Sequence, residues 1–250
     1  MIDRLIIFER AESTQDLVRA MALKGEPEGV ALMALEQTRG RGREGHVWVS
    51  PPGKNLALSL LLRPKIEPVH APLLGLMASV AVAETIEACS IGPIELKWPN
   101  DVMVSRKKIA GILSEGTILH GKVSFVIIGL GLNVNAEEGD FPVELRGLVT
   151  SLFLGSGTTW DLEATAREFM NRMDILYRRV RTEGCGFIAP LWELRWAHRG
   201  QVLEQDGRVG AAEAIGSDGS LLLRATDGRL LSVCSGEARL LPDPLSTRPI

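Results

Sequence analysis

Two apolar runs of strand length, residues 30–35 and 56–62, enclose a stretch in which arginine and glycine alternate. Apolar runs of this length bounded by turn residues predict strands, so residues 39–48 are predicted to form a long loop between two strands. Glycine lets a backbone approach a ligand closely, and arginine offers a planar fork that suits phosphate and carboxylate oxygens. A solvated basic loop or a nucleic-acid patch would have the same residue types, so the loop alone does not identify a function.

The rest of the N-terminal part predicts a mixture of strands and helices. Apolar runs between turn residues predict further strands at 2–8, 109–113 and 123–128, and a hairpin at 94–104 that turns at Pro-Asn-Asp. Apolar residues at helical spacing predict helices at 17–25, 73–88, 158–184 and 187–198.

After Gly200 the sequence changes to short apolar runs separated by Asp-Gly turns. These turns lie at residues 206–207, 217–219 and 227–228. Asp-Gly between short apolar runs is a strong local hairpin signal, so this part predicts a small antiparallel β-barrel or sandwich. We therefore expect two domains, 1–198 and 199–250.

Composition narrows the class of protein. The net charge of −3 argues against a generally basic nucleic-acid binder. The N-terminus lacks the apolar stretch of a signal peptide, and no apolar run approaches the roughly 20 residues that a membrane helix needs. The three cysteines, Cys89, Cys185 and Cys234, are too far apart for a zinc pair and odd in number, which argues against a disulfide framework. We expect a cytoplasmic protein without a bound metal.

Four motifs in a fixed order carry a resemblance to a known family. They are Gln-Thr-Arg-Gly-Arg-Gly-Arg at 37–43, Lys-Trp-Pro-Asn-Asp at 97–101, Lys-Lys-Ile-Ala-Gly-Ile-Leu at 107–113 and Gly-Leu-Gly-Leu-Asn-Val-Asn at 129–135. Together with Ser13-Thr14 and the predicted C-terminal β-domain, they resemble the biotin–protein ligases over close to the whole chain. The resemblance implies an α+β fold: a mixed β-sheet with helices packed on one side, similar to class II synthetases, followed by a small C-terminal β-barrel.

The resemblance also implies a two-step activity. Biotin and ATP, supplied with Mg²⁺, would give biotinyl-5′-AMP and pyrophosphate, and a lysine of a biotin carboxyl carrier protein would then accept the biotin. A homodimer is an expectation, because the family often exposes a sheet edge. No membrane is expected as a partner. No DNA is expected either, because the first predicted strand begins at Ile2 and leaves no room for the helix-turn-helix domain of the family's repressor members.

The site residues follow from matching positions in the motifs. The catalytic cations implied are Arg41, Arg43 and Lys108. The residues implied to bind biotin are Ser13, Thr14, Gln15, Gln37, Gly40, Arg41, Gly42, Lys108 and Gly111. Those implied to bind ATP or the adenylate are Arg41, Arg43, Trp48, Lys97, Asn100, Asp101 and Asn133.

Structural alternatives exist for several of these residues. Ser13 and Thr14 precede a helix, where hydroxyl side chains commonly cap the first turn. Lys97 and Asp101 flank a hairpin turn and could form a simple salt bridge. The chain also departs from the family pattern: Gln15 stands where asparagine is common. His46 replaces a common arginine, which predicts a phosphate contact that depends on pH.

Two other functions compete with this interpretation. A lipoate–protein ligase or octanoyltransferase shares the fold type, but an apolar lipoyl or octanoyl tail needs no ureido-binding hydroxyls, so the Ser13, Thr14 and Gln37 set favours biotin. A non-catalytic nucleic-acid-binding module would use the arginine loop as a phosphate contact. The acidic balance and the scarcity of aromatic residues, one Tyr and six Phe, argue against it.

Overall fold

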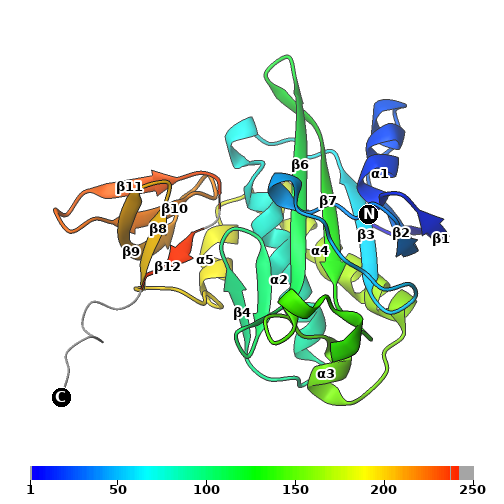
Figure 1. The fold of residues 1–250 in the computed structure, drawn as a ribbon. Coiled ribbons are helices and arrows are strands. Elements are labelled where there is room, and N and C mark those ends of the chain that lie inside the picture. The colour runs from blue at the N-terminus through cyan, green and yellow to red at the C-terminus, as the bar shows by residue number, and fades with distance from the viewer. Residues whose placement is uncertain (1, 237, 242–250) are drawn as a thin grey trace, which may run out of the picture.

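The computed structural model describes residues 2–236 and 238–241. Seven strands form one mixed sheet in the order β1-β2-β3-β7-β6-β5-β4 (Figure 1). β1 runs parallel to β2, and the other neighbouring strands are antiparallel, so the predicted mixed sheet is confirmed. The strands are β1 (Arg4–Ala11), β2 (Val30–Gln37), β3 (Leu56–Leu62), β4 (Ile94–Lys97), β5 (Asp101–Val104), β6 (Lys107–Leu119) and β7 (Lys122–Leu132).

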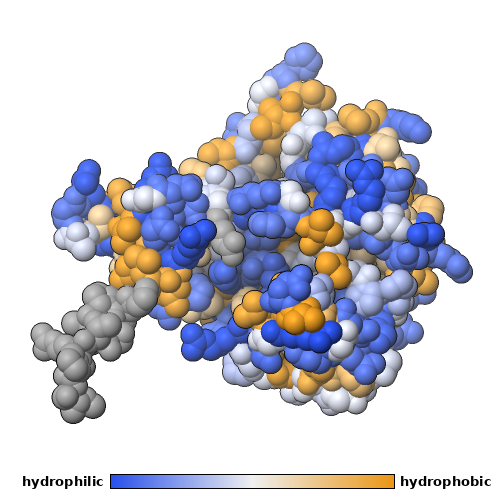
Figure 2. Space-filling view, viewed as in Figure 1, coloured by the Kyte–Doolittle hydropathy of each residue, from blue (hydrophilic) through white to orange (hydrophobic). Residues whose placement is uncertain are grey.

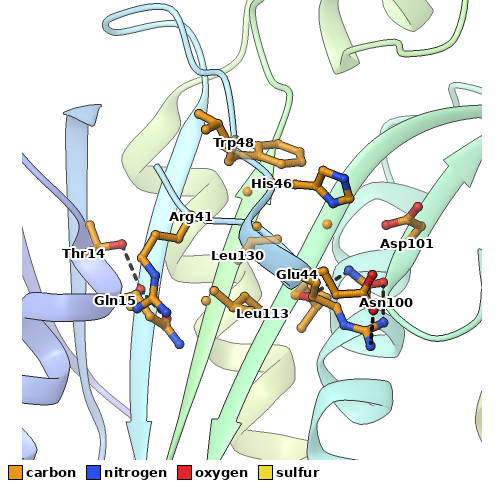
Figure 3. Close-up of a pocket in the computed structure, with 18 of the residues that line it drawn as sticks. Thr14, Gln15, Arg41, Glu44, His46, Trp48, Asn100, Asp101, Leu113 and Leu130 are labelled. Atoms are coloured by element: carbon orange, nitrogen blue, oxygen red, sulfur yellow. Dashed lines mark hydrogen bonds and ion pairs between the residues drawn. The ribbon is translucent and has the colours of Figure 1, made fainter. Parts of the chain in front are cut away.

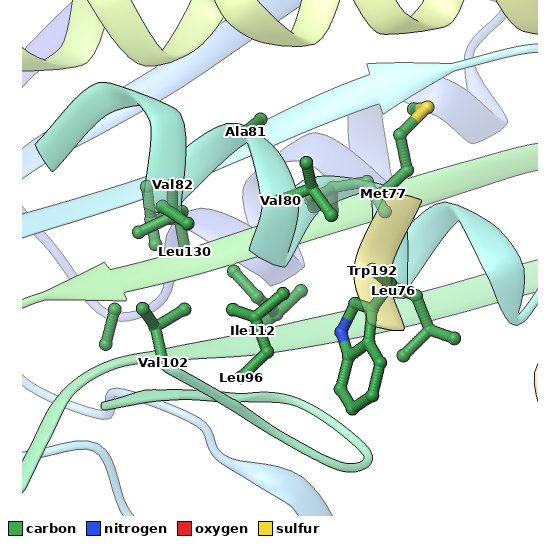
Figure 4. Packing of buried hydrophobic residues seen from close by; sticks show 14 of the residues in the cluster. Leu76, Met77, Val80, Ala81, Val82, Leu96, Val102, Ile112, Leu130 and Trp192 are labelled. Atoms are coloured by element: carbon green, nitrogen blue, oxygen red, sulfur yellow. The ribbon is translucent and has the colours of Figure 1, made fainter. Parts of the chain in front are cut away.

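Helix α2 (Leu73–Glu87) lies at the centre of the main core. It is apolar on every side, a pattern that indicates burial all round. One side packs on the sheet, and the other contacts α4 (Leu162–Glu183) and α5 (Ile188–Glu193). Figure 4 shows Met77, Val80 and Trp192 in this core.

The prediction that no apolar run approaches membrane-spanning length was wrong for the α2 region. Residues Pro68–Glu87 are long and apolar enough to cross a membrane by length and composition, but 67% of the tested stretch is buried inside the protein. The face seen in Figure 2 is mainly hydrophilic, with hydrophobic residues in small separate groups. The apolar character of α2 is therefore explained by its place between the sheet and two helices.

Helix α1 (Thr14–Leu23) covers the opposite face of the sheet. Side chains alternate along a strand, and in β2 the side chains of Ala31 and Met33 join the main core. Val30 and Leu32 point the other way and pack with Val18 and Ala22 of α1 in a second, smaller cluster. The expectation of helices on one side only was therefore wrong for α1, because this end of the sheet is apolar on both faces.

Several predicted helix boundaries move in the structure. α4 begins at Leu162, where the Asp161 side chain accepts a hydrogen bond of 2.7 Å from the Ala164 backbone nitrogen. α5 ends at Glu193, before the predicted end at 198. A short helix, α3 (Leu152–Ser156), was not predicted, and 3-10 turns lie at Arg43–Gly45, Pro68–His70, Glu138–Asp140 and Val143–Leu145.

A second, five-stranded sheet follows at the C-terminal end, as the Asp-Gly turns predicted. It is antiparallel, in the order β11-β10-β9-β8-β12. β12 pairs with β8 and not with β11, so the described strands form an open sheet and the predicted closed barrel is not confirmed. The strands are β8 (Val202–Gln205), β9 (Arg208–Ile215), β10 (Leu221–Arg224), β11 (Leu230–Val233) and β12 (Arg239–Leu240). Residues 242–250 of the predicted domain lie outside the described residues.

The two sheets are joined by a buried hydrogen bond. The indole Nε1 of Trp98, in the β4–β5 turn, donates to the carbonyl oxygen of Gly219 at 3.0 Å. The backbone nitrogen of Ile215 donates to the carboxylate of Glu193 at 2.7 Å. The C-terminal sheet therefore docks directly on the turn that contains the Pro-Asn-Asp motif.

Trp98→Phe should weaken this junction while leaving an aromatic ring in place. Loss of the donor leaves the buried Gly219 carbonyl unpaired, which costs about 1–3 kcal/mol. We expect the free energy of unfolding in urea to fall by this amount. Trp160→Phe is the control, because its partner Ser156 lies where water can replace the lost donor. Equal losses in the two variants would contradict a special role for the Trp98 bond.

Candidate functional site

The main cavity lies where the loop after β2 covers the sheet (Figure 3). Its walls come from the start of α1, this loop, the β4–β5 turn and the central strands β3, β6 and β7. Segments far apart in the sequence therefore meet at one place. All the predicted site residues line the cavity except Gly40 and Asn133.

These two residues have other places in the structure. Gly40 lines an adjoining cleft. A side chain there would meet the Trp48 carbonyl oxygen at 2.4 Å, so the close approach of two backbones requires glycine. Asn133 is buried; its side chain donates to the Thr150 carbonyl at 3.0 Å and accepts from Asn55 at 3.2 Å. Its side-chain amide connects the segments that contain Asn55 and Thr150, outside the cavity. Its predicted binding to ATP or the adenylate stays a prediction.

One end of the cavity is lined mainly by hydroxyl and amide side chains, with Arg41 beside them. The backbone nitrogen of Thr14 donates to the Gln37 amide oxygen at 2.8 Å, and the Thr14 hydroxyl oxygen lies 3.0 Å from the same oxygen. The Thr14 and Ser59 hydroxyl oxygens lie 2.8 Å apart, and Ser59 donates to the Gln15 amide oxygen at 3.0 Å. Hydroxyls and amides of this kind suit a neutral ligand group that both donates and accepts hydrogen bonds.

Ser13 adds an unused hydroxyl to this end. It occupies the N-cap position of α1, as the capping alternative predicted, but its side chain makes no capping hydrogen bond. The hydroxyl oxygen is buried and has no hydrogen-bond partner among the described residues. A buried polar atom without a partner is costly, so a ligand atom would fit here.

Ser59 was missed by the sequence reasoning. It is the one polar residue in the apolar run of β3, and this break in the pattern was the available signal. It is almost fully buried, with 1% of its surface exposed. Its hydroxyl connects Thr14 to Gln15, so it belongs to the polar end of the cavity.

The other end of the cavity gathers positive charge. The Lys108 Nζ lies 2.6 Å from the Asp101 carboxylate and 5.8 Å from the centre of the Trp48 ring. The Arg43 guanidinium donates to the Asn100 side-chain oxygen at 3.3 Å. Asp101 therefore pairs with Lys108, whereas the sequence reasoning offered Lys97 as its structural partner. Lys97 also lines the cavity.

Arg41 lies apart from the other two cations. Its guanidinium donates to Asp16 at 2.7 Å and to Glu115 at 2.8 Å, and Figure 3 shows it beside Gln15, away from Asp101. Burial disfavours the charged form of Glu115, but hydrogen bonds from Gln15 and Arg19 and the charges of Arg41 and Arg19 outweigh it. The pKa of Glu115 therefore lies below its ordinary value.

Trp48 lies on bare backbone between these ends. Gly111 and Gly131 are directly paired in β6 and β7. A Cβ on Gly131 would lie 2.2 Å from the Trp48 ring, and one on Gly111 would lie 3.1 Å from it. The sequence reasoning assigned Gly111 to a ligand ring, and here the pair of glycines admits the indole. Gly131 belongs to the 129–135 motif, of which residues 129–132 lie in β7.

The described residues contain no group of three or more His, Cys, Asp and Glu placed to hold a metal ion. The charged side chains of the described residues that line the cavity are Arg41, Arg43, Glu44, Lys97, Asp101 and Lys108.

Gly131→Ala should displace Trp48, because an atom at 2.2 Å from the indole cannot be accommodated. We expect the melting temperature of the single variant to fall. In a Trp48→Ala background the same substitution should cost much less, since the clash is gone. Thermal melts of the four proteins in this cycle measure the coupling, and additive effects would contradict the contact.

Comparison with protein-family models matches residues 7–133 to the Biotin/lipoate A/B protein ligase family. The chain is 36% identical over 232 residues to the bifunctional ligase/repressor BirA of Bacillus subtilis, covering 91% of this chain and 71% of that protein. It is 33% identical over 229 residues to a biotin–[acetyl-CoA-carboxylase] ligase of Paracoccus denitrificans, covering 86% of this chain and 93% of that protein. It spans 59% of the length of BirA from Bacillus spizizenii, at 39% identity.

A comparison with solved structures also finds a similar biotin protein ligase. The biotin protein ligase from Aquifex aeolicus in complex with biotin and ATP is similar, with a TM-score of 0.80 and 29% identity. The match covers 96% of this chain and 100% of that one. The residues matched by the family model include every site residue predicted above.

Proposed function

Because this chain belongs to the Biotin/lipoate A/B protein ligase family, we propose that it is an ATP-dependent biotin–protein ligase. It joins biotin to AMP with release of pyrophosphate, and then transfers biotin to a lysine of a biotin carboxyl carrier protein. The observation that carries the proposal is the pairing, in one cavity, of an end rich in hydroxyls and amides with an end where Lys108 and Arg43 gather. Biotin has the matching shape: a neutral ureido ring joined by an apolar chain to a carboxylate.

The polar end suits the ureido ring. The hydroxyls of Ser13 and Ser59 and the amide of Gln15 can bond to its carbonyl oxygen and N–H groups. The unpartnered Ser13 hydroxyl supports a ligand at this end. Leu113 and Leu130 line the cavity between the ends and suit the valeryl chain.

The cationic end suits the reacting centre of the first step. A carboxylate oxygen of biotin attacks the α-phosphorus of Mg²⁺-bound ATP; an O–P bond forms, the bond to the bridging oxygen breaks, and pyrophosphate leaves. Negative charge increases on the phosphoryl oxygens, and cations already in place stabilise it. Lys108 and Arg43 are held for this role by Asp101 and Asn100.

The second step takes place at the mixed anhydride. The carrier lysine amine attacks the biotinyl carbonyl carbon; a C–N bond forms, the C–O bond to phosphate breaks, the amine loses a proton, and AMP leaves. The loop at 39–48 covers the adenylate and excludes water that would hydrolyse it. Trp48, whose buried Nε1 has no partner among the described residues, would lie against the adenylate.

The alternative is a lipoate or octanoate ligase or transferase of the same family. An apolar dithiolane or alkyl tail would leave the Ser13 hydroxyl unpaired in its pocket, which disfavours that substrate. Repressor activity, named for the Bacillus relatives, is not proposed for this chain.

The proposal also covers the domain organisation, the location and the oligomeric state of the protein. Residues 1–198 would carry catalysis, and the five-stranded sheet of the predicted 199–250 domain would dock on them through Trp98. A cytoplasmic location fits the three free cysteines. A homodimer would use an edge of the main sheet.

The activity is tested with the purified chain, biotin, Mg²⁺-ATP and a biotin carboxyl carrier domain. We expect the carrier to gain the mass of one biotin and a Lys-to-Arg acceptor variant to gain none. Replacing biotin with lipoate should give no product. A carrier modified by lipoate but not by biotin would establish the alternative.

Lys108→Ala and Arg43→Ala should each slow pyrophosphate release much more than they lower stability. Both charges lie where negative charge develops, and loss of one such group costs roughly 10²–10³ in rate. Lys107→Ala is the matched control, because the neighbouring strand residue points away from the cavity lining. Normal pyrophosphate release by both variants would remove these residues from the mechanism.

A further inference from the structure

Glu115 connects the polar end of the cavity to the loop. It lies on β6 and does not line the main cavity. Its carboxylate accepts a hydrogen bond of 2.9 Å from the Gln15 amide nitrogen and one of 2.8 Å from the Arg41 guanidinium. Arg19 of α1 adds a third contact at 3.0 Å. One carboxylate thus holds a residue of α1 in the cavity wall and a residue of the loop over the cavity.

Glu115 is the nearer of two acceptors that orient the Gln15 amide: its carboxylate lies 2.9 Å from the amide nitrogen, and the Ile127 carbonyl oxygen lies 3.5 Å from it. A carboxylate only accepts hydrogen bonds, so the Gln15 nitrogen must face Glu115. The Gln15 oxygen then faces Ser59, which donates to it at 3.0 Å, on the cavity side. A ligand at this end therefore meets an acceptor rather than a donor. If the Gln15 amide were reversed, an N–H group of the ligand ring would face the N–H group of Gln15.

The contact with Arg41 restrains the loop. Arg41 forms an isolated bridge with Val47, and the Gly42 nitrogen donates to the His46 carbonyl at 2.7 Å. These bonds tie the two sides of the loop tip together, so a restraint on Arg41 also restrains the turn that carries Arg43. Asp16 shares the Arg41 guanidinium but lies in a more exposed position than Glu115.

We propose that Glu115 is a positioning residue that serves both ends of the ligand. It orients the Gln15 oxygen toward the bound ring and holds the Arg41 side of the loop over the cavity. The inference rests on the proposed function for the identity of the ring, but the restraint on the loop does not. Loss of the carboxylate should therefore weaken recognition of the ligand ring and also open the loop that lies over the cavity.

Two substitutions separate the effects. Glu115→Gln keeps a neutral oxygen for the Gln15 amide but removes the charge that attracts Arg41. Glu115→Met has similar length and no oxygen, so it removes both. Glu163→Gln on α4 is the matched control, because it breaks an exposed Glu–Arg pair far from the cavity.

The loop restraint is measured without any ligand. Trypsin cuts after arginine, and cleavage within residues 39–43 follows the open population of the loop. We expect both Glu115 variants to be cut roughly fivefold faster than wild type, as loss of a partly exposed ion pair predicts. Glu163→Gln should be cut at the wild-type rate. Melting temperatures of the variants, measured alongside, identify any general unfolding.

The effect on ring recognition is measured as the affinity for biotin, by calorimetry. We expect Glu115→Met to bind biotin about tenfold more weakly than Glu115→Gln, because only the former frees the Gln15 amide to turn and misplace one hydrogen bond. Equal affinities of the two variants would overturn the amide role. Wild-type cleavage rates in both would overturn the restraint. If wild type binds no biotin, the proposed function fails together with the amide role, and the cleavage rates still decide the restraint.

Discussion

The contact of Trp48 with the bare backbone at Gly111 and Gly131 is the constraint on which the site depends. A Cβ on Gly131 would lie 2.2 Å from the indole, so only glycine permits it. The contact brings the end of the arginine loop down onto the centre of the main sheet. The loop and sheet then enclose a cavity, into which the start of α1 and the β4–β5 turn supply the remaining side chains. A loop that was free in solvent would enclose nothing.

The side chains at each end of the cavity hold one another in place. The polar side chains at one end bond to one another through Ser59, and the cations at the other end are held by Asn100 and Asp101. Preorganised groups need little rearrangement when charge develops, which is how such sites stabilise a transition state. The main core supports this order, because α2 packs behind the strands that form the cavity floor.

The sequence predicted most of the site because the relevant residues occur in compact motifs. Arg43, Asn100 and Lys108 each lie in a run with a recognisable residue pattern, and all of them line the cavity. Ser59 and Glu115 were missed, because neither lies in one of the four motifs at the position that the resemblance marks, and the importance of each lies in partners more than forty positions away. Asn133 shows the reverse case: a residue inside a motif whose amide is used to join structural segments.

By itself, the sequence determined the main strands and helices, the antiparallel hairpins of the C-terminal part and most of the residues that line the cavity, because periodicity, turn chemistry and short motifs are local. Tertiary structure decided what depends on pairing over long distances. It placed α1 on the second face of the sheet and left the C-terminal sheet open. It also separated Arg41 from Arg43, although they are two residues apart, because the ion-pair partners of Arg41 come from α1 and β6.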